Sequence, residues 1–430
     1  MKNVTRLLIL FMIFAVFAAG CGSKGASSGD GGKVTLTLFS TMSNKGERAA
    51  LESVIADFEK ENPDIAIEAN FPGNGYEDML RVKMGANDMP DLFDTHGWSQ
   101  LRYGEYVADL KDMNWVKDLD PALNQILKDE SGKVYAYPLN QAKDGISYNV
   151  KLLEQYGIKP PQTMDEFVKA LEVVKNKSKG DVVPLWIPGG ENGNIAQIFD
   201  QIATPYLITD KENGHGDELL DGSFNWSKYD QLGELMVDLK KKDLLNKDVL
   251  TAKQSQVTEL MAQDKIAFTF VGGSLGPDAT ELNPEVKVGT IPVPAVHKGD
   301  AQSWIGGERF TLAAWKDSKN LDEAKEFIEF AAKPENVKKI AEGTSSTAAL
   351  KNVEADNYYS EFYKQYEEVK VEPYFDRKYL PSGMWSVMST TGQELLAGTL
   401  TAKQLSKKME EEYNRLRKQC LIVLLSANCI

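Results

Sequence analysis

Residues 133–175 read KVYAYPLNQAKDGISYNVKLLEQYGIKPPQTMDEFVKALEVVK, and this stretch decides the expected fold. Residues 134–137 (VYAY) have the alternation of a β-strand, which Pro138 ends. Residues 139–145 are mostly polar and favour a crossing segment, and residues 146–148 (ISY) indicate a second strand. The stretch therefore predicts two strands joined by a polar crossing.

A helix is expected after the second strand, beyond a connection that residues 160–161 (PP) stiffen. Thr163 and Glu166 have the spacing of a capping box, in which both side chains satisfy backbone N–H groups at a helix start. Apolar residues then recur at helical spacing from Phe167 to Val174, which predicts one buried face.

This order of strand, polar crossing, strand, YN, GIKPP turn and T-x-x-E helix resembles the extracellular solute-binding proteins of ABC importers. It is most similar to the sugar-binding branch that includes maltose-binding protein. The resemblance implies an α/β, two-lobed, periplasmic-binding-protein-like fold of type II. Each lobe would be a mixed sheet flanked by helices, with a hinge between the lobes and a ligand cleft beneath which the polar crossing runs.

Composition narrows the class of protein. The chain has 430 residues, 42% of them hydrophobic and 26% charged, which is ordinary for a globular protein of two or three domains. Its net charge of −14 argues against a nucleic-acid partner, because phosphate binding needs clustered Lys and Arg. Cys21, Cys420 and Cys429 form no CxxC pair, and the histidines are scattered, so no metal site or cofactor is expected.

The N-terminus has the pattern of a signal peptide. Residues 1–20 combine a basic start with an apolar run too short for a lasting membrane span. The small residues directly before Cys21 resemble the lipobox of bacterial lipoproteins, which implies acylation of Cys21 and a lipid anchor at the extracellular face of the cell membrane. The alternative is a secretory signal with a cysteine near its cleavage site by chance. Residues 21–32, rich in Gly and Ser, predict a flexible tether.

The next third of the chain predicts a β-α-β-α-β order. Strands are expected at residues 33–39, 65–67 and 90–93, with amphipathic helices between them. Ligands collect outside the carboxyl ends of strands in open α/β sheets. The loops at residues 40–44 and 94–98 are therefore candidate cleft segments.

The resemblance also divides the chain into lobes. It implies an N-terminal lobe of residues 33–142 plus 304–350 and a C-terminal lobe of residues 143–303 plus 351–419. Residues 420–430 (CLIVLLSANCI) form an apolar tail that is too short to span a bilayer and has no explanation in the family pattern.

A sugar has apolar C–H faces and a rim of hydroxyls, so its recognition needs flat aromatic rings and fixed polar groups. The candidate stacking residues are Trp98, Trp304 and Trp385, with burial inside the lobes as the alternative for each. The candidate polar contacts are Thr41, Asp94, His96, Asn140, Gln141, Lys143, Asp144, Ser274 and Glu308, each also readable as a solvated surface residue. Gly272 and Gly307 would allow close backbone approach, although a plain turn is the simpler role.

The sequence thus predicts a monomeric, non-enzymatic receptor that captures a sugar or oligosaccharide by hinge closure and delivers it to an ABC permease. It contains no P-loop or H-E-x-x-H motif. Three alternatives remain open at this point: a sugar sensor for a membrane histidine kinase, a secreted carbohydrate-active enzyme, and a receptor for a peptide or metal.

Overall fold

The computed structural model describes residues 33–191, 193–212 and 214–427. The predicted signal peptide, Cys21 and the tether lie outside the described residues, as does the end of the apolar tail. Among the helices that the structure describes, none combines the length and the apolar character that crossing a bilayer requires.

The N-terminal sheet has the strand order β2-β1-β3-β11-β4. Its strands are β1 (Val34–Phe39), β2 (Ile65–Asn70), β3 (Leu92–Phe93), β4 (Tyr137–Pro138) and β11 (Thr311–Ala314). Strand β1 pairs in parallel with β2 and β3, whereas β11 runs antiparallel to β3 and β4. The predicted β-α-β-α-β order is present, and the carboxyl ends of β1 and β3 meet at one edge of the sheet.

The C-terminal sheet has the order β7-β8-β6-β9. It contains β6 (Ile146–Asn149), β7 (Val183–Trp186), β8 (Ile266–Thr269) and β9 (Val288–Ile291). The residues of β6, β8 and β9 are buried throughout. The polar residues of β6 are hydrogen-bonded there, Ser147 to the Val271 carbonyl at 2.7 Å and Asn149 to Asp264 at 2.8 Å.

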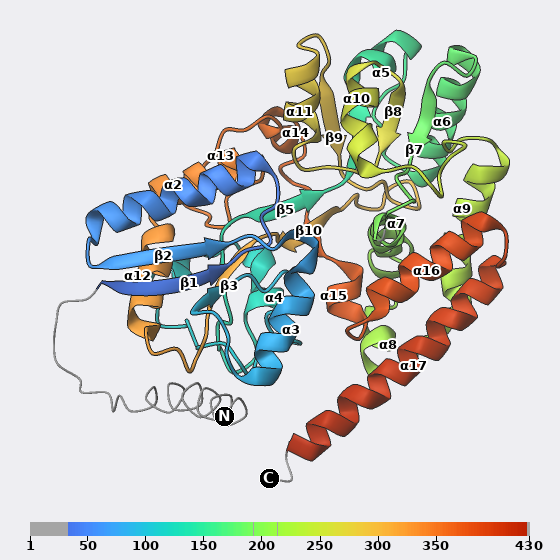
Figure 1. Ribbon diagram of the computed structural model, residues 1–430. Helices are drawn as coiled ribbons and strands as arrows, with labels where there is room; N and C mark the ends of the chain where they lie inside the picture. The colour runs from blue at the N-terminus through green and yellow to red at the C-terminus, as the bar shows by residue number, and fades with distance from the viewer. Residues whose placement is uncertain (1–32, 192, 213, 428–430) are drawn as a thin grey trace, which may run out of the picture.

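A third, three-stranded sheet lies between these two and has the order β12-β10-β5. Strand β5 (Gln141–Asp144) pairs antiparallel with β10 (Trp304–Glu308), and β10 pairs in parallel with β12 (Val371–Pro373). Strand β5 is the predicted polar crossing, because it lies in the chain between β4 of one sheet and β6 of the other. Figure 1 shows β5 running from one half of the molecule toward the other.

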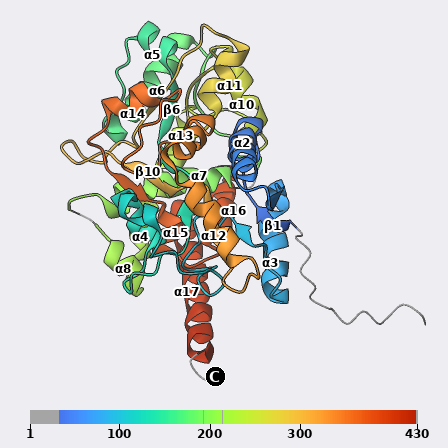
Figure 2. The same ribbon diagram turned by 90° about the vertical axis from the view of Figure 1, so that its left-hand side faces the viewer.

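Helices cover both main sheets (Figures 1 and 2). They are α2 (Lys45–Glu61), α3 (Tyr76–Ala86), α4 (Asn124–Leu127), α5 (Val150–Tyr156), α6 (Met164–Ser178), α7 (Asn194–Ala203), α8 (Gly216–Asp221), α9 (Asp230–Lys241), α10 (Val257–Ala262), α11 (Leu275–Leu282), α12 (Leu321–Ala331), α13 (Pro334–Gly343), α14 (Ser360–Gln365), α15 (Phe375–Tyr379), α16 (Met384–Ala397) and α17 (Ala402–Ala427). The backbone of α17 continues into the segment that was predicted as an apolar tail, and both views show the helix extending beyond the body of the lobe.

Two large clusters of buried side chains lie on either side of the crossing sheet. One surrounds Leu36, Leu51 and Phe327, and the other surrounds Phe199, Phe268 and Met409. Together with the two sheets, these clusters confirm the predicted two-lobed α/β fold, and we refer to them as the N-terminal and C-terminal lobes. The boundaries at residues 142/143, 303/304 and 350/351 stay a prediction.

Candidate functional site

A cleft of about 620 Å³ lies between the lobes, beside the crossing sheet. Its aromatic lining comes mainly from the C-terminal lobe: Trp186, Phe270, Tyr359, Tyr363, Tyr374 and Trp385. The polar lining from the N-terminal lobe and its loops includes Thr41, Ser43, Asn44, Glu47, Glu77, His96, Arg309, Ser345 and Ser346. The cleft therefore has an aromatic wall facing a polar wall, which suits a ligand with both apolar and hydroxyl surfaces.

Several predicted contact residues line this cleft. They are Thr41, His96, Lys143, Asp144, Gly272, Ser274 and Trp385. Thr41 and His96 belong to the loops that follow β1 and β3, where the strand-end argument placed them. Their presence at the cleft does not by itself test whether they bind a ligand, so their role remains a prediction.

The other predicted contact residues do not line the cleft in this structure. They are Asp94, Trp98, Asn140, Gln141, Trp304, Gly307 and Glu308. Each is placed by packing or internal hydrogen bonds that the sequence alone does not show.

The two indoles in this group are packed inside the lobes. Trp304 has 0% exposure and packs edge-on against Tyr363 and Tyr366, because β10 is the central strand of the crossing sheet and is covered on both faces. Trp98 is 8% exposed and lies beneath the guanidinium of Arg102, at 4.7 Å from the ring centroid.

The buried amides belong to the hinge. Asn140 donates to Thr344 Oγ1 at 2.8 Å and accepts from the Phe310 backbone N–H at 3.1 Å. Gln141 accepts through its side-chain oxygen from the Thr347 hydroxyl at 3.3 Å. These bonds tie Gln141 of β5 and the preceding Asn140 to neighbouring segments of the chain, whereas Nε2 of Gln141 is buried and has no partner among the described residues.

Asp94 and Gly307 also contact other parts of the protein instead of lining the cleft. Asp94 accepts from the Thr41 hydroxyl, from the His96 backbone N–H at 2.9 Å and from both donors of Thr311 at 2.9–3.0 Å. It thereby holds the loops after β1 and β3 next to β11. At Gly307, whose φ is 147°, an added methyl group would lie 2.4 Å from Ile126 Cδ1.

Glu308 lies at the end of β10 and is fully buried, and among the described residues nothing donates to either carboxylate oxygen. Burial raises the pKa of Glu308 to about 7, although the charge of Arg377 acts in the opposite direction. A buried acid without a donor is better placed to titrate than to bind a sugar hydroxyl.

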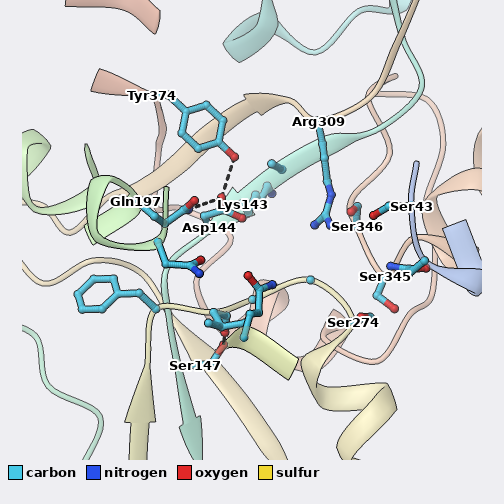
Figure 3. Close-up of a pocket in the computed structure, with 18 of the residues that line it drawn as sticks. Ser43, Lys143, Asp144, Ser147, Gln197, Ser274, Arg309, Ser345, Ser346 and Tyr374 are labelled. Atoms are coloured by element: carbon cyan, nitrogen blue, oxygen red, sulfur yellow. Dashed lines mark hydrogen bonds between the residues drawn. The ribbon is translucent and has the colours of Figure 1, made fainter. Parts of the chain in front are cut away.

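Asp144 is the best-positioned acid in the cleft (Figure 3). Its Oδ2 accepts from the Tyr374 hydroxyl at 2.7 Å and from Gln197 Nε2 at 3.3 Å, so two elements of the C-terminal lobe fix the carboxylate. Burial, together with the charge of Asp144, raises the pKa of Tyr374 well above its usual value, so its hydroxyl remains a donor. Oδ1 has no donor among the described residues.

Sequence reasoning missed two arginines that line the cleft, Arg309 and Arg377. Arg309 donates through Nη2 to Glu47 Oε1 at 2.9 Å, across 262 residues of sequence. Arg377 stacks on the Tyr374 ring at 4.1 Å and donates weakly to the Glu308 carbonyl at 3.4 Å. No local pattern placed either residue at the cleft, because the Glu47 partner of Arg309 and the Glu308 carbonyl that Arg377 reaches are distant from them in the sequence or on another element.

Lys143, which the sequence predicted as a ligand contact, also lines the cleft. Burial lowers the pKa of Lys143, and its ammonium lies 5.8 Å from the Tyr363 ring centroid. Elsewhere, among the described residues, no cluster of His, Cys, Asp or Glu has the makings of a metal site. The residues that line the cleft offer hydrogen-bonding groups and aromatic rings.

Comparisons with known proteins agree with this geometry. The chain is 56% identical over 415 residues to the melibiose/raffinose/stachyose-binding protein MelE of Bacillus subtilis strain 168, covering 96% of this chain and 97% of that one. A sugar transporter protein of Bacillus licheniformis, solved with stachyose, is 63% identical, with a TM-score of 0.81 over 89% of this chain and all of that chain.

A Bacillus subtilis binding protein crystallised in an open conformation is 57% identical, with a TM-score of 0.85 over 91% of this chain and 99% of that chain. A sequence model of the family described as "Bacterial extracellular solute-binding protein" matches residues 43–338. The match covers well over half of the chain, includes both lobes and agrees with the hinge and cleft described above. The chain therefore belongs to the bacterial extracellular solute-binding protein family.

Proposed function

We propose that this protein captures oligosaccharides of the melibiose, raffinose and stachyose series and delivers them to an ABC permease. The observation that carries the proposal is the cleft itself, with an aromatic wall on one lobe and fixed polar groups on the other. The high identity to a protein named for these three sugars, and to one solved with stachyose, supports the choice of ligand.

Asp144 and Trp385 are the residues on which we rest sugar recognition. Oδ1 of Asp144, to which no described residue donates, is free to accept from sugar hydroxyls, and charge-assisted hydrogen bonds are about twice as strong as neutral ones. Trp385, at the start of α16, offers an indole face for a sugar ring. We further propose that Thr41, His96, Lys143 and Ser274 contribute contacts from both walls.

Capture works by hinge closure. The crossing strands β5 and β10 link the lobes, and a ligand that contacts both walls favours the closed arrangement by its differential affinity for it. At the start of β5, the buried Asn140 and Gln141 fix the strand to Thr344 and Thr347 through their side-chain bonds.

We also propose that Cys21 carries the lipid that holds the protein at the extracellular face of the membrane. The small residues before Cys21 and the extracellular family support this placement. Replacing Cys21 with alanine should release the protein into the medium, as measured by immunoblotting of membrane and culture fractions. Equal membrane retention of the variant would contradict the anchor.

Isothermal titration calorimetry of the purified mature protein tests the ligand. Melibiose, raffinose and stachyose are expected to bind, with dissociation constants in the micromolar range or tighter, and maltose serves as the comparison disaccharide. Stachyose should be recovered intact after prolonged incubation, since we propose no catalysis. Binding of maltose without any of the three galactosides, or hydrolysis of stachyose, would overturn this assignment.

A further inference from the structure

We propose that Arg309 and Arg377 are cross-cleft positioning residues that set how closely the lobes approach around the ligand. Each is held by its own lobe and rests on a glycine of the opposite lobe. This inference rests on the proposed function and extends it, because it names the contacts that define the closed arrangement.

Arg309 follows the hinge strand β10 and is fixed on the N-terminal lobe. Its guanidinium pairs at 2.9 Å with Glu47, whose side chain is buried and lies in the first turn of α2. From there it reaches the loop after β8, where a methyl group added at Gly273 would lie 2.9 Å from Nη1 and 3.0 Å from Nη2. Gly273 also has φ +64°, a conformation that favours glycine.

Arg377 makes the equivalent contact in the opposite direction. It belongs to α15 of the C-terminal lobe and is stacked on Tyr374. Its guanidinium lies against Gly97 of the N-terminal lobe, where a methyl group would be only 2.3 Å from Nη1. Gly97 has φ +83° and follows β3. Arg102 adds a neighbouring inter-lobe bond, donating to Ser382 Oγ at 3.3 Å.

Both contacts join groups on opposite sides of the cleft, so rotation about the hinge separates them. They therefore belong to the arrangement in which the lobes are together. A side chain at either glycine would meet the arginine, so the guanidinium group would have to leave its position or the lobes would have to stay further apart. Because both arginines also line the cleft, the same guanidinium groups meet ligand hydroxyls when the lobes close.

Paired glycine substitutions separate this role from backbone strain. Gly97→Ala is compared with Gly132→Ala, which has φ +87° and no atom within 4 Å of the added methyl group. Gly273→Ala is compared with Gly157→Ala, which has φ +65° and equally open surroundings. Both members of a pair place alanine at a similar positive φ, so the backbone strain is matched. Only the first member of each pair also adds a methyl group between the lobes.

We expect the dissociation constant for stachyose to rise about tenfold or more for Gly97→Ala and Gly273→Ala, since overpacking is unfavourable. The two comparison variants should stay within about twofold of wild type while losing similar thermal stability. The Gly97→Ala loss should shrink in an Arg377→Ala background, and the Gly273→Ala loss in an Arg309→Ala background. Equal losses within each pair, or strictly additive double variants, would overturn the inference.

A measurement without ligand keeps this inference separate from the ligand assignment. Double electron–electron resonance between spin labels on the two lobes reports the distribution of inter-lobe distances in the sugar-free protein. Gly97→Ala and Gly273→Ala should lose the shortest distances, whereas Gly132→Ala and Gly157→Ala should retain them. If wild type binds none of the sugars, the proposed ligands fail, and this distance measurement alone decides the role of the arginines.

Discussion

Asp144 and Glu308 are both acids near the hinge, but their surroundings give the two carboxyl groups different properties. Asp144 faces the cleft and receives hydrogen bonds from Tyr374 and Gln197, so its charge is supported. Glu308 is buried without a donor among the described residues, and its pKa is raised to about 7. The first is suited to ligand binding and the second to titration.

Tyr374→Phe is expected to weaken stachyose binding while leaving the fold intact. The substitution removes the hydroxyl that fixes Asp144, and a hydrogen bond to a charged group contributes about 1.5–3 kcal/mol, which corresponds to a tenfold or greater rise in the dissociation constant. Tyr379→Phe, at the last residue of the helix that Tyr374 precedes, removes a hydroxyl that does not bond to Asp144 and is the control. Calorimetry that finds equal affinities for the two variants would contradict the role of Tyr374.

Trp304→Ala and Trp385→Ala should have different effects. Trp304 is fully buried, so its truncation should lower the free energy of unfolding by about 3–5 kcal/mol. Trp385 lines the cleft, and its truncation should mainly weaken sugar binding. Urea unfolding and calorimetry on both variants check this. A greater loss of stability for Trp385→Ala than for Trp304→Ala would reverse the two assignments.

Glu308→Gln should remove part of the pH dependence of stability. Because the pKa of Glu308 is raised, its carboxyl stays protonated between about pH 4.5 and 7 in the folded state but ionises in the unfolded state. The contribution of this group to the free energy of unfolding is therefore fully present below about pH 4.5 and is lost as pH rises through 7. The loss amounts to about 3 kcal/mol. The variant should therefore match wild type near pH 4.5 and exceed it at pH 8 in urea unfolding. Parallel pH profiles would contradict this.

At the scale of elements, the start of α2 joins helix stability to the cleft. Asn44 accepts from the Glu47 backbone N–H at 2.8 Å, and the Glu47 carboxylate accepts in return from the Asn44 N–H at 3.4 Å, forming a capping box. The same Glu47 holds Arg309. A local capping signal in the sequence thus also determines where a cleft cation lies.

Asn44→Ala should lower the free energy of unfolding by about 1 kcal/mol through loss of the cap, and should also weaken sugar binding because Asn44 lines the cleft. Thr163→Ala removes the corresponding cap of α6, in which the Thr163 hydroxyl accepts from the Glu166 N–H at 3.2 Å. This cap does not line the cleft. The Thr163 substitution should cost a similar amount of stability without changing affinity. Denaturant unfolding and calorimetry compare the two, and unchanged binding by Asn44→Ala would limit its role to capping.

For the whole molecule, the lobes have separate cores and are linked by the crossing strands, so relative motion of the lobes is expected. Saturating stachyose should lower the radius of gyration measured by small-angle X-ray scattering, because the ligand favours the closed arrangement. Adding maltose provides the comparison. A scattering curve that stachyose leaves unchanged, at concentrations where calorimetry shows saturation, would contradict hinge closure.

The sequence by itself determined the β-α-β-α-β order and the two strands joined by a polar crossing, because local periodicity and Pro, Gly and capping residues indicate them. The two-lobed arrangement was implied by the resemblance of that order to the solute-binding proteins. The sequence also placed Thr41, His96 and Asp144 near the cleft, since strand ends and the crossing strand converge there. Only the tertiary structure decided which indoles face the cleft, because the burial of Trp304 depends on elements that cover both faces of the crossing sheet. The same holds for Arg309 and Arg377, whose positions come from contacts between the lobes and between distant segments, which local patterns do not encode.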